Sequence, residues 1–436
     1  MESVESMKIP KVIGTRDFYP EDMAVRNWII DGWKRVSLRN GFEEYDGPIF
    51  EYLTMFQIKS GEEIVEQLFS LKDRGGRDLA LRPEITPTLA RMVNQRINSL
   101  PRPIKWFSVP RLFRAERPQK GRLREFFQWN VDIIGVDDVL ADAEVIFTTV
   151  DYLRSVGLTS KDVKVKISSR KLLSAVLKQI GISEDKLNPL YVLLDKKPKV
   201  PAETFETMLS EQVQDKSKVY KIVQFMNAAS IPQLEATLMM ISDERIQAYA
   251  DIKKLLLTLA FMGIDDFCMF DPSIVRGLAY YTGIVFEVHD VSGDLRAICG
   301  GGRYDNLLRD FGGPAMPATG MGMGDCVLEI LLRKKGLLNV PIRQLDFFVA
   351  FADLRWYGDM YSIISKLRSR GFNAEFSYNS NASLSKQLKV ASERNAKYCI
   401  IIGDEFKDNN LVVKDMEAGK QEEVEVDKFF AELKRK

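Results

Sequence analysis

The stretch "KWFSVPRLFRAERPQKGRLREFFQWNVDIIG", residues 105–135, decides the fold of this chain. Pro118 and Gly121 lie near its middle and predict a turn between two strands, so we expect an antiparallel hairpin. Between positions 105 and 125, only Glu116 and Glu125 oppose seven basic residues, which are Lys105, Arg111, Arg114, Arg117, Lys120, Arg122 and Arg124. A solvated charged hairpin would explain the basic loop by itself, whereas the second strand indicates more.

The second strand of the hairpin has two faces of different chemistry, because successive side chains of a strand alternate. The apolar face comprises Phe127, Trp129, Val131 and Ile133, and the other face comprises Arg124, Phe126, Gln128, Asn130 and Asp132. A single aromatic ring among polar groups suits stacking on a base, and nearby arginines suit phosphates. The pattern therefore predicts a nucleotide that lies across a sheet.

The stretch "DLALRPEITPT", residues 78–88, shows a similar alternation, in which Arg82, Glu84 and Thr86 share one parity. A carboxylate and a hydroxyl on one face of a strand can bind an ammonium group. A salt bridge on an edge strand would produce the same pattern, so the residues favour both interpretations equally.

Two tyrosines follow an arginine in "IVRGLAYYTGIVFEV", residues 274–288. Tyr280 and Tyr281 would point to opposite faces of a regular strand, so one of the two is expected to reach a pocket near Arg276. Further on, "CGGGRYDNLL" places three glycines before Arg303 and Tyr304. Missing side chains there allow a ligand or another backbone to approach closely.

The glycine-rich stretch "TGMGMGDCVLEILL", residues 319–332, superficially resembles a phosphate-binding loop that leads into a helix. Its glycines at positions 320, 322 and 324 alternate with period two, which places them on one face of a strand. Asp325 also stands where a G-x-G-x-x-G fingerprint would need its last glycine. We therefore expect these glycines to clear space for a group such as an adenine rather than to bind phosphates.

Bulk composition excludes several classes of function. The 62 Lys and Arg residues nearly cancel the 61 Asp and Glu residues, so nucleic-acid affinity would have to come from local patches. His289 is the only histidine, and the four cysteines form no C-x-x-C pair, which argues against histidine-dependent hydrolases, zinc sites and disulfide frameworks. No apolar run reaches the roughly 18 residues of a membrane span, and the first residues lack signal-peptide features. We expect a cytoplasmic protein.

The order of helical and strand patterns predicts an α+β fold rather than a βαβ array. At 436 residues, two or three domains are expected. Helical spacing dominates the middle of the chain, and after a proline-bearing linker short apolar strands alternate with amphipathic helices, which suggests a separate α/β domain with a partly parallel sheet. The predicted segments are 1–167, a helical insertion at 168–260, 261–335, and the separate domain at 343–436.

Several motifs together resemble a known family. "FRAERPQKGRLREFFQ" is similar to the second signature of class II aminoacyl-tRNA synthetases, and "VRGLAYYTGIVFE" and "GGGRYDNLL" are similar to two signatures of histidyl-tRNA synthetases. "GTRDFYP" and "LRPEITPT" also match, and "SLSKQLKVASERNAKYCIIIGD" resembles the family's anticodon-binding domain. The resemblance runs from about Gly14 to the end. It implies a catalytic domain with a six-stranded antiparallel sheet, formed by 1–167 and 261–335, an anticodon-binding domain at 343–436, and a homodimer.

The resemblance also implies roles for individual residues. Those of the histidine site would be Glu84, Thr86 and Gln128 at the α-ammonium group, and Asp132 and Tyr281 at the imidazole, with Tyr280 and Tyr304 nearby. Those of the ATP site would be Arg114 at the α-phosphate, Phe126 on the adenine, Arg122 at the distal phosphates, and Glu116. Arg276 would act with Arg114 in catalysis, and Arg117 and Gln119 would approach the acceptor end of tRNA(His). The substrates would be histidine, tRNA(His), and ATP with Mg²⁺, without zinc, an organic prosthetic group or a membrane.

The chain departs from the family pattern at four positions. Many relatives carry Glu at the position of Asp132 and an acid at the position of Ala279. Family members also commonly follow the glycine-rich strand with Glu-Arg, whose arginine packs over ATP, whereas Cys326 and Val327 occupy these positions here. We expect another basic residue of the hairpin, with Arg122 the first candidate, to take over part of this role.

Two alternatives remain open from the sequence. A non-catalytic relative that senses histidine or tRNA, or that regulates another enzyme, would explain the missing arginine, although Arg276 and the C-terminal domain are present. A general single-strand nucleic-acid binder would explain the basic hairpin and its aromatic face. The second alternative leaves Glu84, Asp132 and Tyr281 without a role.

Overall fold

The computed structural model describes residues 9–58, 68–197, 200–241, 247–275, 281–341 and 344–434. The chain divides into two compact units, Met1–Val340 and Pro341–Lys436, and each unit is described by itself. The boundary predicted at position 343 lies outside the described residues, and the predicted division of the first unit into three segments stays a prediction.

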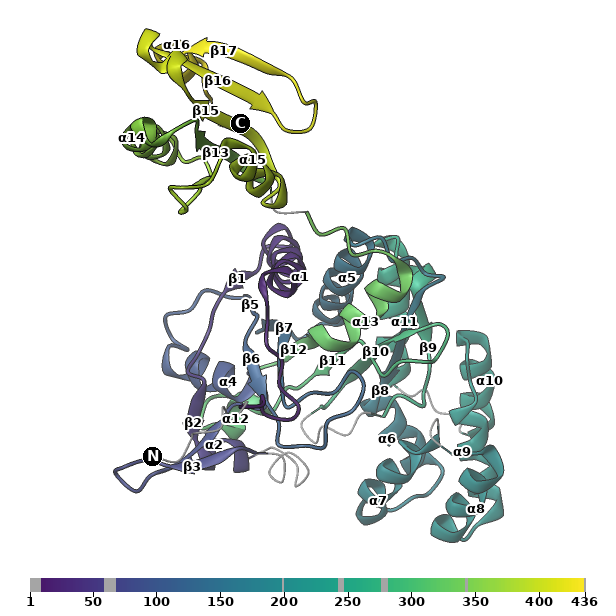
Figure 1. Cartoon of the computed structure of the whole chain (residues 1–436). Coiled ribbons are helices and arrows are strands. Elements are labelled where there is room, and N and C mark those ends of the chain that lie inside the picture. The colour runs from purple at the N-terminus through teal and green to yellow at the C-terminus, as the bar shows by residue number, and fades with distance from the viewer. Residues whose placement is uncertain are drawn as a thin grey trace, which may run out of the picture. The chain divides into compact units, whose positions relative to one another are not determined.

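A nine-stranded sheet forms the centre of the first unit (Figure 1). Its strands are β1 (Glu43–Glu44), β5 (Ile104–Ser108), β6 (Arg111–Phe113), β7 (Glu125–Ile134), β8 (Val163–Ser169), β9 (Cys268–Phe270), β10 (Ile284–Asp290), β11 (Cys299–Arg303) and β12 (Ala318–Gly324). The strand order is β1-β5-β7-β12-β11-β10-β8-β9, and β6 pairs with β7. Neighbours from β5 to β8 are antiparallel, while β1 and β9 add parallel edges. The sheet contains the expected six antiparallel strands, and the α+β class is confirmed.

Three helices cover the apolar face of this sheet, and they are α1 (Pro20–Arg39), α5 (Val139–Ser155) and α13 (Asp325–Lys335) (Figure 1). Trp129 of β7 lies between Trp33 of α1 and Tyr152 of α5, with ring centroids 6.2 and 5.5 Å away. The indole N–H of Trp129 donates to Ser37 Oγ over 2.8 Å. Phe127, Trp129, Val131 and Ile133 are buried, which confirms the predicted apolar face of β7.

A small antiparallel sheet of order β2-β4-β3 lies beside the large one in Figure 1, and helix α4 follows it in the chain. Its elements are β2 (Phe50–Tyr52), α2 (Leu53–Gln57), β3 (Ser70–Lys72), β4 (Asp78–Leu81) and α4 (Thr86–Gln95), with α12 (Leu307–Asp310) packed on α4. The prediction that Glu84 and Thr86 lie on one strand is wrong. β4 ends before Pro83, which has no N–H to donate, and Thr86 begins α4, whose first turn accommodates Pro87.

A group of helices follows β8 and lies beyond that end of the sheet in Figure 1. The helices are α6 (Arg170–Gln179), α7 (Glu184–Leu194), α8 (Ala202–Val213), α9 (Lys216–Met226), α10 (Ile231–Ile241) and α11 (Gln247–Phe261), followed by the short η2 (Asp265–Phe267). α11 packs against α5 and α6 and returns the chain to β9. The predicted helical character of this region is confirmed.

The second unit is a mixed sheet of order β14-β13-β15-β16-β17, in which β13 pairs in parallel with β14 and β15. Its elements are β13 (Leu345–Phe351), η3 (Leu354–Trp356), α14 (Tyr357–Ser369), β14 (Ala374–Phe376), α15 (Leu384–Glu393), β15 (Ala396–Ile402), η4 (Asp404–Asp408), β16 (Asn410–Asp415), β17 (Gln421–Glu425) and α16 (Val426–Glu432). Phe347 and Val349 pack with α14 and α16, whereas Phe348 and Ala350 pack with α15. Burial on both faces explains why β13 reads as a continuous apolar run.

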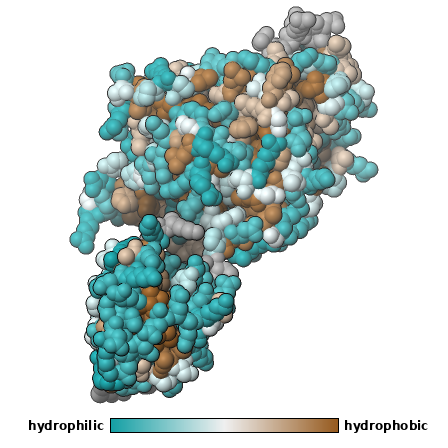
Figure 2. Space-filling view, turned by 90° about the horizontal axis from the view of Figure 1, so that it is seen from above, coloured by the Kyte–Doolittle hydropathy of each residue, from teal (hydrophilic) through white to brown (hydrophobic). Residues whose placement is uncertain are grey.

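The surface in Figure 2 is dominated by hydrophilic residues, among which hydrophobic residues form separate groups. Within the part of the chain that the structure describes, every helix is too short or too polar to cross a membrane.

Candidate active site

Two adjoining pockets lie on the polar face of the large sheet, opposite the face covered by α1, α5 and α13. The smaller one, of about 130 Å³, is named the Asp132 pocket and is lined by Glu84, Thr86, Arg114, Gln128, Asn130, Asp132, Tyr281, Gly300, Tyr304, Gly320, Met321 and Gly322. The larger one, of about 320 Å³, is named the Phe126 pocket. Both are lined by Arg114 and Gln128, so the two cavities meet at these side chains.

Six of the residues predicted for the histidine site line the Asp132 pocket, although they come from distant parts of the chain. They are Glu84, Thr86, Gln128, Asp132, Tyr281 and Tyr304. Glu84 precedes α4 and Thr86 begins it, whereas Tyr281 lies before β10 rather than within a regular strand. The seventh residue predicted for the histidine site, Tyr280, lies outside the described residues, as does the catalytic candidate Arg276.

Asp132 carries a buried carboxyl group whose pKa is raised within the smaller pocket. Asp132 is 3% exposed, and this burial raises the pKa of its carboxyl group to about 7. A hydrogen bond from the Tyr304 hydroxyl to Oδ1 lowers the pKa and partly offsets the effect of burial. Oδ2 is buried and accepts no hydrogen bond from any described residue. Since an unsatisfied buried oxygen is costly, Asp132 is suited to accept a hydrogen bond from an N–H group of a ligand.

The glycines of β12 form the floor between the pockets, and each stands opposite a residue of β7. Gly320 pairs with Asp132 in register, and a Cβ added to it would lie 2.0 Å from Asp132 Oδ1. A Cβ on Gly322 would lie 2.8 Å from Gln128 Cδ, whereas one on Gly324 would meet nothing within 4 Å. The first two glycines therefore make room for side chains of β7, and only Gly324 leaves space that a ligand could use.

The predicted strand conformation of this stretch is confirmed, and its use as a phosphate loop is excluded by the next residue. Asp325 begins α13, and its Oδ1 accepts a hydrogen bond from the backbone N–H of Phe127 over 3.0 Å. Its Oδ2 lies 2.5 Å from Arg16 Nη2. A carboxylate at the N-terminus of α13 satisfies the helix dipole internally, which leaves this helix end unsuited to a phosphate.

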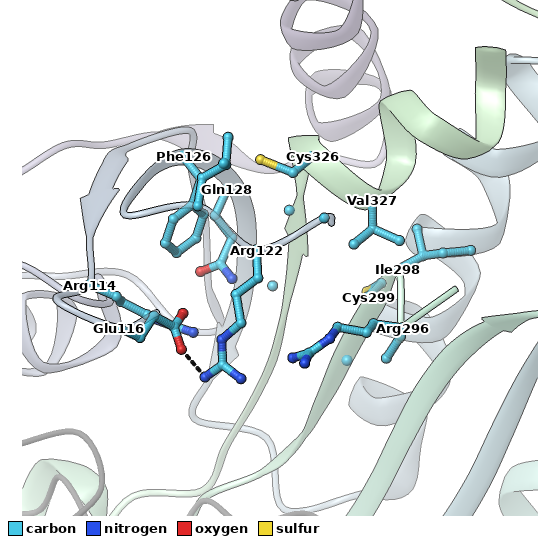
Figure 3. Close-up of a pocket in the computed structure, with 16 residues that line it drawn as sticks. Arg114, Glu116, Arg122, Phe126, Gln128, Arg296, Ile298, Cys299, Cys326 and Val327 are labelled. Atoms are coloured by element: carbon cyan, nitrogen blue, oxygen red, sulfur yellow. Dashed lines mark ion pairs between the residues drawn. The ribbon is translucent and has the colours of Figure 1, made fainter. Parts of the chain in front are cut away.

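The Phe126 pocket is the more cationic of the two. Figure 3 shows the guanidinium groups of Arg122 and Arg296 directed into it, with Phe126 and Gln128 on one wall and Cys326 and Val327 on another. Its lining comprises Arg114, Glu116, Gly121, Arg122, Leu123, Phe126, Gln128, Arg296, Ala297, Ile298, Cys299, Gly300, Gly322, Gly324, Cys326 and Val327. All four residues predicted for the ATP site, Arg114, Glu116, Arg122 and Phe126, are among them.

Contacts within the protein orient these four side chains. Arg114 Cζ lies 5.1 Å from the ring centroid of Phe126, and its Nε donates to the carbonyl of Pro83 over 3.2 Å. Arg122 forms an ion pair with Glu116, whose side chain is 8% exposed (Figure 3). The arginine predicted to serve the distal end of the nucleotide thus already has a carboxylate partner within the protein.

The remaining predicted residues, Arg117 and Gln119, line neither pocket. Both are exposed on the loop of the hairpin between β6 and β7. Gln119 Oε1 accepts a hydrogen bond from Arg296 Nη2 over 2.5 Å, which ties the hairpin loop to the segment between β10 and β11.

The sequence interpretation missed Arg296. A single arginine in "SGDLRAICGGG" has no periodic pattern, and its only hint was its position three residues before the glycine-rich strand β11. His289, by contrast, lines neither pocket and pairs with Glu287 at 2.9 Å.

The pocket lining was also compared with the needs of a divalent cation. Among the described residues, no three or more His, Cys, Asp or Glu side chains are grouped so as to hold a metal ion. Glu116 is the one carboxylate in the lining of the Phe126 pocket. This donor set fits a cation that receives most of its ligands from nucleotide phosphates and water, as Mg²⁺ commonly does.

Comparisons with known proteins agree with this geometry. Residues 14–324 match the family model described as histidyl-tRNA synthetase, and residues 354–436 match the model of an anticodon binding domain. A histidine–tRNA ligase of Arabidopsis thaliana, described as chloroplastic/mitochondrial, is 40% identical over 95% of this chain and 84% of its own length. A Pyrococcus abyssi histidine–tRNA ligase is 37% identical over 98% of this chain and 99% of its own.

Solved structures give the same result at the level of the fold. The apo histidyl-tRNA synthetase of S. aureus aligns with a TM-score of 0.73 and 26% identity, covering 98% of this chain and 100% of that chain. Because the family model matches more than half of the chain, and relatives of 37% to 40% identity cover nearly all of it, the chain belongs to the histidyl-tRNA synthetase family.

Proposed function

We infer that the chain is a class II aminoacyl-tRNA synthetase that ligates L-histidine to tRNA(His) in an ATP-dependent reaction through a histidyl-adenylate. The observation that carries this inference is the shared wall of the two pockets, since Arg114 and Gln128 line both. An amino acid in the Asp132 pocket and a nucleotide in the Phe126 pocket would therefore meet at a guanidinium group.

The Asp132 pocket is the proposed histidine site. Glu84, Thr86 and Gln128 offer oxygen acceptors for the α-ammonium group, and Asp132 and Tyr281 would address the two imidazole nitrogens. Tyr304 would act through its hydrogen bond to Asp132, which fixes the orientation of that carboxylate. Tyr280 keeps its proposed place near the imidazole on the family resemblance alone.

The Phe126 pocket is the proposed ATP site. Phe126 would stack on the adenine, and Arg114, which already packs on the ring of Phe126, would contact the α-phosphate. Arg122 would bind the distal phosphates, and Glu116 would orient it through their ion pair. Mg²⁺ bound to the phosphates would neutralise part of their charge, which fits the single carboxylate in this lining.

This reaction needs no protein nucleophile. The histidine carboxylate attacks the α-phosphorus of ATP and pyrophosphate leaves, after which a ribose hydroxyl at the end of the tRNA attacks the carbonyl of the adenylate and AMP leaves. Orientation and fixed positive charge supply the rate enhancement of the first step. Arg114, which lines both pockets, would contribute to this role, and Arg276 is proposed to share it on the basis of the family resemblance.

The tRNA partner is proposed to contact both units. Arg117 and Gln119, exposed on the hairpin loop, would lie near its acceptor end. The second unit would bind the anticodon, and the aromatic rings of Tyr361, Phe376 and Tyr378 pack in sequence there with centroids 5.2 and 4.7 Å apart. Tyr378 is 84% exposed, so it offers a stacking surface for an unpaired base.

We also propose a homodimer. Three apolar side chains of the small sheet, Phe50, Tyr52 and Leu71, are between 46% and 55% exposed. Tyr52 and Leu71 are both paired in register with Leu79, which lies between them on the central strand. Such a row of exposed apolar side chains is typical of an interface between copies of a chain. In sedimentation analysis we expect a species of twice the mass of one chain.

The proposed compartment is the cytoplasm, where ATP, tRNA and reduced thiols coexist.

The function is tested by ATP–pyrophosphate exchange with each amino acid in turn. We expect exchange with histidine alone, followed by aminoacylation of tRNA(His). A folded protein that binds histidine in a calorimeter but shows no histidine-dependent exchange would contradict the enzyme and support a non-catalytic relative. The relatives reported above are named as ligases, which favours the enzyme.

A further inference from the structure

Arg296 brings a guanidinium group into the Phe126 pocket from a segment to which the family resemblance assigned no role. It lies between β10 and β11, and Figure 3 shows its guanidinium directed into the same space as that of Arg122. Arg296 is exposed, and its Nη2 donates to Gln119 Oε1 over 2.5 Å. A long flexible side chain held at this place by one hydrogen bond retains most of its donors for another partner.

The charge around Arg296 indicates what that partner is. Three arginines line the pocket, Arg114, Arg122 and Arg296, and they face the single carboxylate of Glu116, which pairs with Arg122. Arg296 forms no ion pair with any carboxylate of the described residues. Guanidinium groups that converge on one cavity repel each other unless an anion lies between them, and the excess positive charge matches a polyphosphate.

The wall contributed by the start of α13 carries no compensating charge. Val327 packs against the turn of the hairpin, where a Cβ on Gly121 would lie 2.9 Å from Val327 Cγ2. Cys326 beside it is buried, and burial raises the pKa of its thiol, so it is neutral. The positive charge at the outer part of the pocket is therefore supplied by Arg296, in the segment before β11, and not by a residue of α13.

Gln119 and Arg122 are held together at the tip of the hairpin. The backbone N–H of each donates to the carbonyl of the other over 2.9 Å, which forms an isolated β-bridge. Arg122 then reaches into the pocket directly, while the Gln119 side chain holds Arg296. The same small turn thus determines the position of two arginines, one through the backbone and one through a side-chain amide.

We propose that Arg296, positioned by Gln119, binds the terminal phosphates of ATP together with Arg122. The proposal rests on the proposed function of the pocket. It assigns Arg296 as a substrate-binding residue and Gln119 as a positioning residue, whose effect on ATP is exerted through Arg296. Gln119 therefore influences adenylation even in the absence of tRNA.

The test is ATP–pyrophosphate exchange without tRNA, in which KM for ATP, KM for histidine and kcat are measured for single variants. Arg296→Ala is expected to raise KM for ATP about tenfold, as for the loss of one charge-assisted hydrogen bond, with little change in KM for histidine. Arg296→Lys should recover part of this loss, since it retains the charge but not the planar fork. Gln119→Ala should raise KM for ATP severalfold, because Arg296 is the one partner of the Gln119 side chain among the described residues.

Arg333→Ala is the matched control, since Arg333 is exposed on α13, pairs with Glu329 and lines neither pocket. Its KM for ATP should equal that of the wild type. An unchanged KM for ATP in Arg296→Ala would overturn the proposal. If Gln119→Ala alters only the transfer to tRNA and leaves exchange unchanged, its positioning role is overturned.

The proposed function can fail separately from this inference. A wild-type protein without histidine-dependent exchange would contradict the function, and calorimetric titration of ATP into wild type and Arg296→Ala would then test Arg296 by binding alone. Equal affinities in that titration would overturn the inference, whereas a roughly tenfold weaker variant would support it.

Discussion

The two pockets on the sheet share a wall but hold their charges in opposite ways. The Asp132 pocket contains a carboxyl group that is 3% exposed and is fixed by a neighbouring hydroxyl. The Phe126 pocket contains arginines near the surface, of which Arg122 and Arg296 already have protein partners. The first arrangement favours selection of one small ligand, because a desolvated group strongly rejects molecules that cannot pair with it. The second favours binding of a flexible polyanion, since several exposed cations can adjust to it.

The largest expected effect comes from removing Arg114, the arginine that lines both pockets. Arg114→Ala should lower kcat/KM for histidine-dependent exchange by a hundredfold or more, because a fixed charge at the reacting centre is typically worth about 3 kcal/mol. The matched control is Arg111→Ala on β6, the strand that ends directly before Arg114. Arg111 pairs with Glu125 and lines neither pocket. Equal effects of the two substitutions would show that Arg114 contributes only general positive charge.

Asp132→Asn should weaken the binding of histidine while hardly changing the binding of ATP. The amide still accepts the hydrogen bond from Tyr304 but lacks the charge, so KM for histidine should rise ten- to a hundredfold, as for loss of a charged hydrogen bond of about 1.5 to 3 kcal/mol. KM for ATP should change less than twofold. A comparable rise in both constants in exchange assays would show that the pockets are not energetically separate.

The same substitution should stabilise the fold at alkaline pH. Burial raises the pKa of Asp132 from 3.8 to about 7, so the folded state holds this proton more tightly than the unfolded state. Its contribution to stability is therefore lost as pH rises from about 4 to about 7, by up to about 4 kcal/mol. Asp132→Asn removes this penalty, and its melting temperature should exceed that of the wild type at pH 8 by more than at pH 5.5. An identical difference at both pH values would argue against a raised pKa.

Gly320→Ala should impair both the Asp132 pocket and the stability of the fold, whereas Gly324→Ala should lower the stability only slightly. The added Cβ at position 320 would lie 2.0 Å from Asp132 Oδ1 and 2.8 Å from the backbone oxygen of Val131, which a central strand cannot move. We expect KM for histidine to rise about tenfold and the melting temperature to fall. Gly324→Ala should cost about 1 kcal/mol or less, the difference between glycine and alanine at a helix N-cap. Equal melting temperatures of the two variants would contradict the assigned register.

The smallest effect is expected in the Phe126 pocket. Arg122→Ala should raise KM for ATP severalfold in exchange assays and leave KM for histidine unchanged, because Arg122 is one of several cations there and must share its charge with Glu116. If KM for ATP is unaffected, the absence of an arginine at Val327 is not compensated by the hairpin.

The sequence was informative wherever a local period carried the chemistry. The alternation along β7 predicted both the buried Trp129 and the pocket-lining face of Phe126, Gln128 and Asp132, because one strand contains all of these residues. Glu84 and Thr86 reach the Asp132 pocket although the predicted strand was wrong. A residue pair on the turn into α4 can serve the same site as a pair on a strand, and parity alone cannot distinguish them.

The part of the site that sequence reasoning missed depends on contacts between distant segments. Arg296 and Gln119 are 177 positions apart in the chain, and they meet only because the segment before β11 lies close to the hairpin loop. No period within either segment encodes this approach. Likewise, the roles of Gly320 and Gly322 follow from the register of β12 against β7. This register is determined by the pairing of the two whole strands.

Gly324 is a position where the pocket proposed for ATP can be reshaped at a small expected cost in stability. Its missing side chain leaves open space beside the Phe126 pocket, and among the described residues none beyond its two chain neighbours lies within 4 Å of where a Cβ would be. A methyl group there would lie in this open space without displacing a described neighbour. If ATP binds in the Phe126 pocket as proposed, such a methyl group would take space from the nucleotide, so a trimmed ATP analogue is expected to be preferred by the variant.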